Sequence, residues 1–134
     1  MRPHAHTLLQ TASRVGVLLA SLACAACGEV PAPDRAYRQV ERGDADRGRQ
    51  LIVHYQCGSC HTIPEAASSA VGVGPSLAGF ARRSYIAGQV PNGPATLQRW
   101  LLDPQALVPG AAMPDLGMSV EDARDIAAYL MSRP

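Results

Sequence analysis

The sequence contains no lysine, and among its 134 residues there are one phenylalanine, one tryptophan and four tyrosines. So few large side chains give a thin apolar core to a domain of about 90 residues. The formal net charge of +1 provides no basic field for nucleic acid. The length leaves room for one folded domain and excludes a large enzyme with a separate substrate domain.

The sequence also lacks any strand-like alternation of apolar and polar residues, and it has no internal repeats. Its clearest periodicity is helical. Apolar residues recur at intervals of three and four between 123 and 131, and Ser119 and Asp122 precede them with capping-box spacing. We therefore expect an all-α fold.

Capping residues and prolines predict the other helical segments. The expected segments are 44–55, 75–83 and 94–103. Asp44 caps the first, and Pro94 stands at the first position of the third. The second is expected to be a short turn. Prolines between 104 and 114 predict an extended loop before the last helix.

Residues 1–27 differ from the rest of the chain. A polar stretch with two arginines and no acidic residue, 1–14, precedes an apolar one, 15–26. This pattern is typical of a secretory signal, and the apolar run is shorter than the roughly 20 residues that span a bilayer. A buried core helix is the alternative. We expect export, an extended tether at 28–43 and a folded domain at 44–134.

Two of the four cysteines lie at the end of this apolar stretch. Cys27 follows two alanines and precedes a glycine, which resembles a bacterial lipoprotein cleavage site, where the cysteine becomes the lipidated first residue. A lipid at Cys27 would anchor the protein to the periplasmic side of the membrane. Ordinary cleavage with a soluble periplasmic product is the alternative.

The other two cysteines form the motif Cys57-Gly58-Ser59-Cys60-His61, which is the C-x-x-C-H signature of haem c attachment. Two thiols three positions apart reach the two vinyl groups of one porphyrin and form thioethers. The histidine that follows lies beneath the iron and supplies its proximal nitrogen. We expect one covalent haem with His61 as a ligand.

A zinc site or a thioredoxin-like redox pair is the alternative for two cysteines at this spacing. Zinc would need a second pair of ligands, but His54 and His61 are the only histidines after the signal region. A thioredoxin fold would need a central sheet. Both alternatives are disfavoured.

Met113 is the expected sixth ligand of the iron. It stands in a loop between Ala112 and Pro114, before the last helix, and His/Met ligation raises the potential of a haem. Met118 and Met131 fit core positions better. His54 is a rival ligand by chemistry, but its place on the incoming helix predicts a solvent-facing side chain.

Several motifs in this order resemble a class I cytochrome c, especially the cytochrome c domain fused to subunit II of some bacterial haem-copper oxidases. The matching segments are C-G-S-C-H at 57–61, G-P-S-L at 74–77, P-N-G-P-A-T-L-Q-R-W-L-L-D-P-Q-A at 91–106, P-G-A-A-M-P at 109–114 and I-A-A-Y-L at 126–130. The resemblance implies about three to five short helices wrapped around one haem c.

The resemblance also implies roles for residues near the haem. Trp100, with Asn92 or Tyr85, would donate a hydrogen bond to a haem propionate. Arg82 or Arg83 would balance the propionate charge. Core packing for Trp100 and a solvated face for the arginines are the alternatives.

Two further contacts are implied by the same resemblance. The Pro75 carbonyl would accept a hydrogen bond from the His61 ring and orient it. The first and last helices would cross closely at Gly48, which would otherwise cost about 1 kcal/mol in a helix interior.

These features predict an electron-transfer protein rather than an enzyme. With His61 and Met113 on the iron, no position remains for a substrate. The expected function is to carry electrons in a respiratory chain, from a cytochrome bc-type complex or a dehydrogenase to a haem-copper oxidase, as a monomer or as a subunit of a larger complex. Alternatives are the haem c subunit of a periplasmic dehydrogenase or reductase, and a haem enzyme or gas sensor with a labile sixth ligand. The sequence has no cupredoxin segment and no transmembrane pair, so we expect a separate carrier or subunit.

Overall fold

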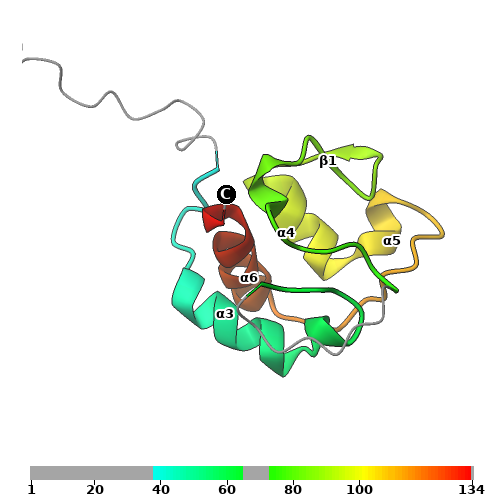
Figure 1. Ribbon diagram of the computed structural model, residues 1–134. Coiled ribbons are helices and arrows are strands. Elements are labelled where there is room, and N and C mark those ends of the chain that lie inside the picture. Colours follow the sequence, from blue (N-terminus) through cyan, green and yellow to red (C-terminus); the bar gives the residue numbers. More distant parts are fainter. Residues whose placement is uncertain (1–37, 65–72, 134) are drawn as a thin grey trace, which may run out of the picture. The chain divides into compact units, whose positions relative to one another are not determined.

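Two helices, α3 (Ala45–His54) and α6 (Val120–Ser132), cross one another, and the other elements pack around them (Figure 1). The computed structural model describes residues 38–64 and 73–133. The other elements are η1 (Cys57–Ser59), η2 (Phe80–Arg82), β1 (Tyr85–Ile86), β2 (Val90–Pro91), α4 (Pro94–Leu102) and α5 (Pro104–Leu107).

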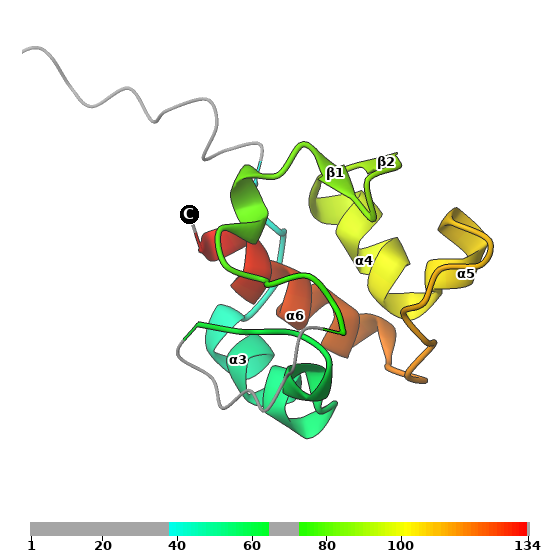
Figure 2. The ribbon, with the colours of Figure 1, turned by 45° about the vertical axis from the view of Figure 1, so that its right-hand side comes forward.

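The predicted all-α fold class is confirmed, with one small addition. Strands β1 and β2 form an antiparallel pair in which Tyr85 lies opposite Pro91 and Ile86 opposite Val90. Figure 2 shows this pair beside the beginning of α4, and α5 follows the end of α4. The two-residue strands are too short to produce the alternation by which a strand is found in a sequence.

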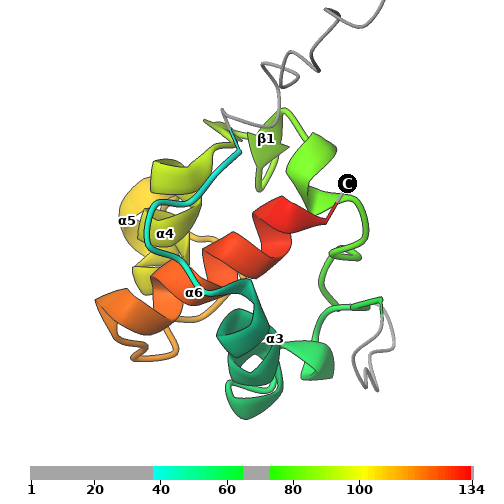
Figure 3. The ribbon, with the colours of Figure 1, turned by 90° about the vertical axis from the view of Figure 1, so that its left-hand side faces the viewer.

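The crossing of α3 and α6 depends on Gly48. A Cβ atom at this position would lie 2.0 Å from the carbonyl oxygen of Asp125 and 3.0 Å from the Cβ of Tyr129. No residue with a side chain fits there unless the helices separate. The two backbones therefore approach directly, as the crossing in Figure 3 shows.

Both predicted caps are present. The Asp44 side chain accepts hydrogen bonds from the amides of Asp46 and Arg47, at 2.9 and 3.0 Å. Ser119 Oγ accepts from the amide of Asp122 at 3.1 Å and begins α6. Each cap satisfies amides that have no partner within the helix.

Two segments differ from the prediction. Over 75–83 only Phe80–Arg82 forms a helical turn. Gly79 has a left-handed φ of 58°, and before it the amide of Leu77 bonds to the carbonyl of Thr62 instead of within a helix. The expected loop over 104–114 begins with the short helix α5. Asp103 caps it by accepting from the amide of Ala106 at 3.0 Å. An Asp-Pro pair is a helix start, a signal that the loop prediction overlooked.

The apolar core lies between α3, α4 and α6. Its buried members are Val40, Ile52, Ile63, Phe80, Ala81, Ile86, Leu97, Trp100, Leu101, Val108, Met118, Ala123, Ile126, Ala127, Ala128, Tyr129, Leu130 and Met131. Met118 and Met131 are among them, in agreement with the core positions predicted for both.

The predicted signal at 1–27, Cys27 and most of the tether at 28–43 lie outside the described residues. Within the described part of the chain, no helix combines the length and apolar character that crossing a membrane requires.

Polar contacts reinforce the crossing of α3 and α6. The buried Asp125 accepts hydrogen bonds from the amide of Asp44 at 3.0 Å and from the Arg47 guanidinium. Asp122 accepts from the Tyr55 hydroxyl at 2.8 Å and also pairs with Arg47. One guanidinium thus bridges two carboxylates of α6.

These contacts lower the pKa of both carboxyl groups. The hydrogen bond from Tyr55, together with that from Arg47, lowers the pKa of Asp122 despite its partial burial. Burial by itself would raise the pKa of Asp125, but the hydrogen bonds from the Asp44 amide and Arg47 outweigh it. The ionised carboxylates therefore stabilise the fold above about pH 4, and this contribution is lost as the pH falls through the folded pKa values.

Replacing Asp125 by Asn should weaken this network without creating a cavity, because the two side chains have nearly the same shape. Asn keeps an acceptor for the Asp44 amide but loses the charge that faces Arg47, so the free energy of unfolding at pH 7 should fall by about 2 kcal/mol. The loss of stability between about pH 5 and 2 should also be smaller than in the wild type. Chemical unfolding of the mature holoprotein, followed by the fluorescence of the single tryptophan, measures both effects.

Glu121→Gln is the matched control, because Glu121 is an exposed acidic residue in the first turn of the same helix. It should leave stability and acid dependence close to those of the wild type. An acid dependence in Asp125→Asn as steep as that of the wild type would show that the network does not stabilise the fold.

Candidate haem site

The haem attachment motif forms one tight turn directly after α3. The helix ends at His54, and Gln56 adopts a left-handed φ of 54° that redirects the chain into η1. The amide of His61 then bonds to the carbonyl of Cys57 at 2.9 Å. Cys57, Cys60 and His61 all line one cavity, so this short turn presents two thiols and an imidazole to the same space.

The tautomer of His61 follows from its contact with Pro75. The ring Nδ1 lies 2.7 Å from the Pro75 carbonyl oxygen, where the resemblance places a hydrogen bond. A carbonyl oxygen accepts only, so Nδ1 carries the proton and donates. Nε2 is left with its lone pair, which is the form that binds a metal ion.

Gly74 allows the chain to pass close to the His61 ring. A Cβ atom at Gly74 would lie 2.6 Å from His61 Cε1 and 2.7 Å from Nδ1. Two backbone hydrogen bonds of 2.8 Å, from Gly74 to Cys60 and from Leu77 to Thr62, hold the two segments together. The loop that carries the Pro75 carbonyl is thus attached to the segment that carries the ring.

The cavity has a volume of about 420 Å³ and a largely apolar wall, within the range of cofactor sites. Apart from Met113 and the exposed Val73 and Tyr85, its larger apolar lining residues are Ile52, Leu77, Phe80, Ile86, Leu97, Trp100, Leu101, Val108, Ile126 and Leu130. Helices α3, α4 and α6 supply most of them. These helices therefore turn part of their apolar side chains toward the cavity and part toward one another.

The two thiols are not joined in a disulfide. Burial raises the pKa of the Cys57 thiol. Among the described residues, no cluster of three or more histidine, cysteine or acidic side chains could hold a metal ion.

Met113 is far from the attachment motif in the sequence, but its side chain lies in the same cavity. Its side chain belongs to the lining and comes from the segment between α5 and α6. Trp100 Nε1 lies 3.1 Å from Met113 Sδ and donates a hydrogen bond to the sulfur. His54, the rival ligand, is exposed and is not part of the lining.

The contact between Trp100 and Met113 adds a partner that the sequence did not predict for Trp100. An indole has a single N–H donor, and in this structure it is directed at the Met113 sulfur. The two residues are 13 positions apart, in a helix and in a loop. Sequence spacing gives no signal for such a pair.

Asn92 bonds to the backbone on both sides of Arg82. Both hydrogens of its side-chain amide are used, in bonds of 3.0 Å to the Phe80 carbonyl and 3.1 Å to the Arg83 carbonyl. Its Oδ1 is buried and has no partner among the described residues. In this structure Asn92 therefore fixes the segment around η2.

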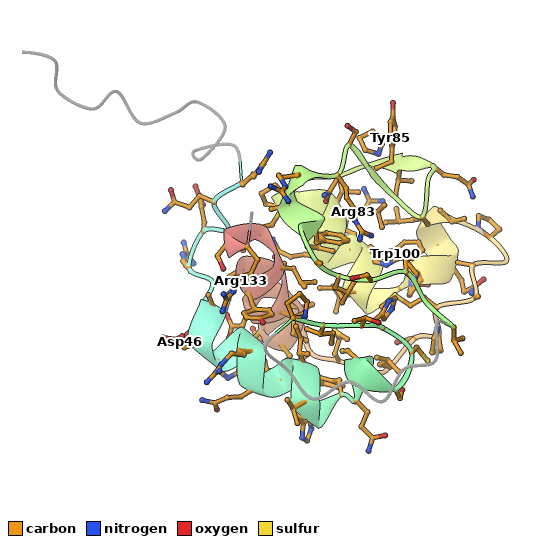
Figure 4. All side chains as sticks on the ribbon, in the orientation of Figure 1. Asp46, Arg83, Tyr85, Trp100 and Arg133 are labelled. Atoms are coloured by element: carbon orange, nitrogen blue, oxygen red, sulfur yellow. The ribbon has the colours of Figure 1, made fainter. Side chains whose placement is uncertain are left out.

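Of the two adjacent arginines, Arg83 and not Arg82 lines the cavity. The Arg83 guanidinium lies 5.5 Å from the Phe80 ring centroid and donates to the carbonyl of Ser76. Tyr85 also lines the cavity, although 56% of it is exposed. Figure 4 shows Tyr85 pointing away from the domain, whereas Arg83 and Trp100 lie nearer its centre.

These residues fit a haem. Two thiols spaced for the vinyl groups, an imidazole with a free Nε2 and a thioether sulfur all belong to one apolar cavity. A half-buried arginine beside them suits a group with an apolar plate and acidic substituents.

Comparisons with known proteins agree with this site. The family model described as cytochrome c matches residues 45–134. Cytochrome c oxidase subunit 2 of Alkalihalophilus pseudofirmus is 37% identical over 89 residues, which are 66% of this chain and 25% of that protein. Cytochrome c2 of Rhodoblastus acidophilus is 36% identical over 103 residues, covering 66% of this chain and 91% of that protein.

Among solved structures, cytochrome c2 from Rhodobacter capsulatus is similar, with a TM-score of 0.49 and 24% identity over 67% of this chain and 97% of that one. The chain spans only a quarter of the oxidase subunit, but most of each cytochrome c2. The likeness to the oxidase subunit therefore concerns a single domain. The match over 45–134, together with the two cysteines in the cavity, shows that the chain belongs to the cytochrome c family, whose members carry electrons on one haem c attached through cysteines, here Cys57 and Cys60.

Proposed function

We propose that His61 Nε2 and Met113 Sδ are the two axial ligands of the haem iron and that the protein transfers single electrons without binding a substrate there. The observation that carries this proposal is that both side chains line one cavity and that a neighbour orients each of them. Pro75 accepts from His61, and Trp100 donates to Met113.

The haem supplies a one-electron couple between ferrous and ferric iron. The protein's part is to hold this couple in a fixed, dry environment. Thioethers at Cys57 and Cys60 retain the group, and the apolar wall excludes water. The Pro75 carbonyl raises the basicity of the imidazole by accepting a hydrogen bond from its Nδ1–H, whereas the Trp100 N–H draws electron density from the sulfur. A haem enzyme or gas sensor would instead need an open sixth position.

The pathway is the second part of the proposal. We infer that the protein is exported and passes electrons to a haem-copper oxidase, after receiving them from a cytochrome bc-type complex or a dehydrogenase. The likeness of this domain to part of an oxidase subunit 2 supports that acceptor. Signal cleavage before Cys27, a lipid at Cys27 and a tether that begins at 28 and ends before the core residue Val40 would place the domain on the periplasmic side of the membrane.

The surface around the cavity indicates how a partner would dock. The exposed lining residues are Val73, Pro75, Tyr85, Ala87, Gln89, Pro109, Gly110, Ala112 and Pro114, and none is charged. Arg83 lines the cavity too, but it is half-buried and bonded to Ser76. We propose that partners recognise this surface through apolar contacts rather than through charge.

Met113→Ala tests the ligand assignment. Loss of the sulfur should open the iron to carbon monoxide in the reduced protein and lower the reduction potential, on the order of 100 mV within the roughly 0.8 V range that axial ligands control. Redox titration and optical spectra measure both effects. Met118→Leu removes a buried methionine outside the cavity lining and should leave the potential unchanged. An unaltered potential in Met113→Ala would rule Met113 out as the ligand.

Trp100→Phe tests the hydrogen bond to sulfur while keeping an aromatic ring in the core. Without the N–H donor, the sulfur becomes a better donor to ferric iron, so the potential should fall by roughly 20–60 mV, the one-electron equivalent of one hydrogen bond. The spectrum should still be low-spin with methionine bound. A potential equal to or above that of the wild type would contradict this role.

Electron delivery tests the pathway and the docking surface together. The reduced holoprotein should support oxygen consumption by membranes that contain a haem-copper oxidase. Between about 20 and 200 mM salt the second-order rate constant should change less than about threefold, because the exposed cavity lining among the described residues carries no charge to steer the encounter. A tenfold or larger loss would mean that charge guides docking. No electron delivery at any salt concentration, with a stable dehydrogenase co-purifying, would favour the alternative subunit role.

A further inference from the structure

The backbone that carries Met113 comes out of a tight turn. The amide of Ala111 bonds to the carbonyl of Val108 at 3.0 Å, with Pro109 and Gly110 between them. Gly110 has a left-handed φ of 81°, which is the geometry of a type II turn with proline second and glycine third. Only Ala112 separates this turn from Met113, so the orientation of the turn directs the methionine.

The side chain of Gln105 spans this turn. Its Oε1 accepts a hydrogen bond from the amide of Gly110 at 2.9 Å, and its Nε2 donates to the carbonyl of Ala111. One primary amide thus bonds a donor and an acceptor on consecutive residues. Such a pair of contacts restrains both the position and the rotation of the turn, whereas a single hydrogen bond would leave rotation free.

Helix α5 presents Gln105 to the turn. Asp103 begins the helix by accepting from the amide of Ala106, and the helix lasts only four residues. Gln105 is exposed and does not belong to the cavity lining. It therefore holds the loop from outside, while Trp100 bonds to the Met113 sulfur from within.

We propose that Gln105 is a positioning residue for Met113 and that its clamp on the turn at 108–111 sets how readily the sulfur is displaced. This rests on the proposed function, in which Met113 is the sixth ligand. Without the clamp, the exposed peptide groups of Gly110 and Ala111 would bond to water, and the turn could swing outward with Met113. The sulfur would still bind at equilibrium, but it would leave more often.

Displacement by imidazole measures this directly in the ferric holoprotein. At saturating imidazole the observed rate reaches a limit set by the departure of the sulfur. In Gln105→Ala this limiting rate should rise about tenfold, which corresponds to about 1.4 kcal/mol in the barrier. Gln105→Glu keeps the length and the acceptor but loses the donor to Ala111, so its rate should rise as well. The resting spectrum of both variants should stay low-spin.

Gln50→Ala is the matched control, because Gln50 is an exposed glutamine on helix α3 and the substitution is the same. Its limiting rate should equal that of the wild type. A wild-type rate in either Gln105 variant would overturn the proposal. The proposal would also be overturned if the free energy of unfolding in urea fell by as much as the barrier to displacement. Imidazole would then bind because the whole protein unfolds, and not because the turn moves.

Met113→Ala distinguishes a failure of this proposal from a failure of the ligand assignment. If Met113 is the ligand, this variant should bind imidazole without any limiting step. A limiting rate unchanged from the wild type would remove Met113 from the iron and the clamp proposal with it. Fast binding in Met113→Ala, combined with wild-type rates in the Gln105 variants, would refute the clamp alone.

Discussion

The approach of α3 to α6 at Gly48 is the constraint on which the cavity depends. With a Cβ position only 2.0 Å from the Asp125 carbonyl oxygen, the backbones touch and no side chain separates them. Ile52, one turn further along α3, and Ile126 on α6 then reach the same cavity wall. Because the attachment turn follows directly on α3, the crossing also determines where the thiols and the imidazole lie.

The two sides of the cavity are held in different ways. On one side, His61 is oriented by a carbonyl whose loop is bonded to the attachment segment itself, so ligand and support are parts of one structure. On the other side, Met113 stands in a loop whose supports, Trp100 and Gln105, come from two successive helices. The Met113 side depends on contacts from more elements, and those of Gln105 are exposed to solvent. We therefore expect Met113 to leave its position in the cavity more readily than His61.

Polar groups around the cavity act mainly on the protein itself. The Trp100 N–H bonds to the Met113 sulfur, and both Asn92 hydrogens bond to the backbone around η2. Arg83 bonds to the Ser76 carbonyl and covers Phe80. These contacts shape the cavity, and its exposed lining residues carry no charge.

The sequence alone determined what depends on local chemistry. The spacing of Cys57, Cys60 and His61 predicted a covalent haem, and the caps at Asp44 and Ser119 predicted α3 and α6, because these features involve residues within one turn of each other. Only the tertiary structure determined which partners the polar side chains of Trp100 and Gln105 bond to. Neither the bond from the Trp100 indole to the Met113 sulfur nor the contacts of Gln105 had any signal in the sequence. Packing brings such groups together from separate helices and loops, and sequence spacing does not encode the distance between them.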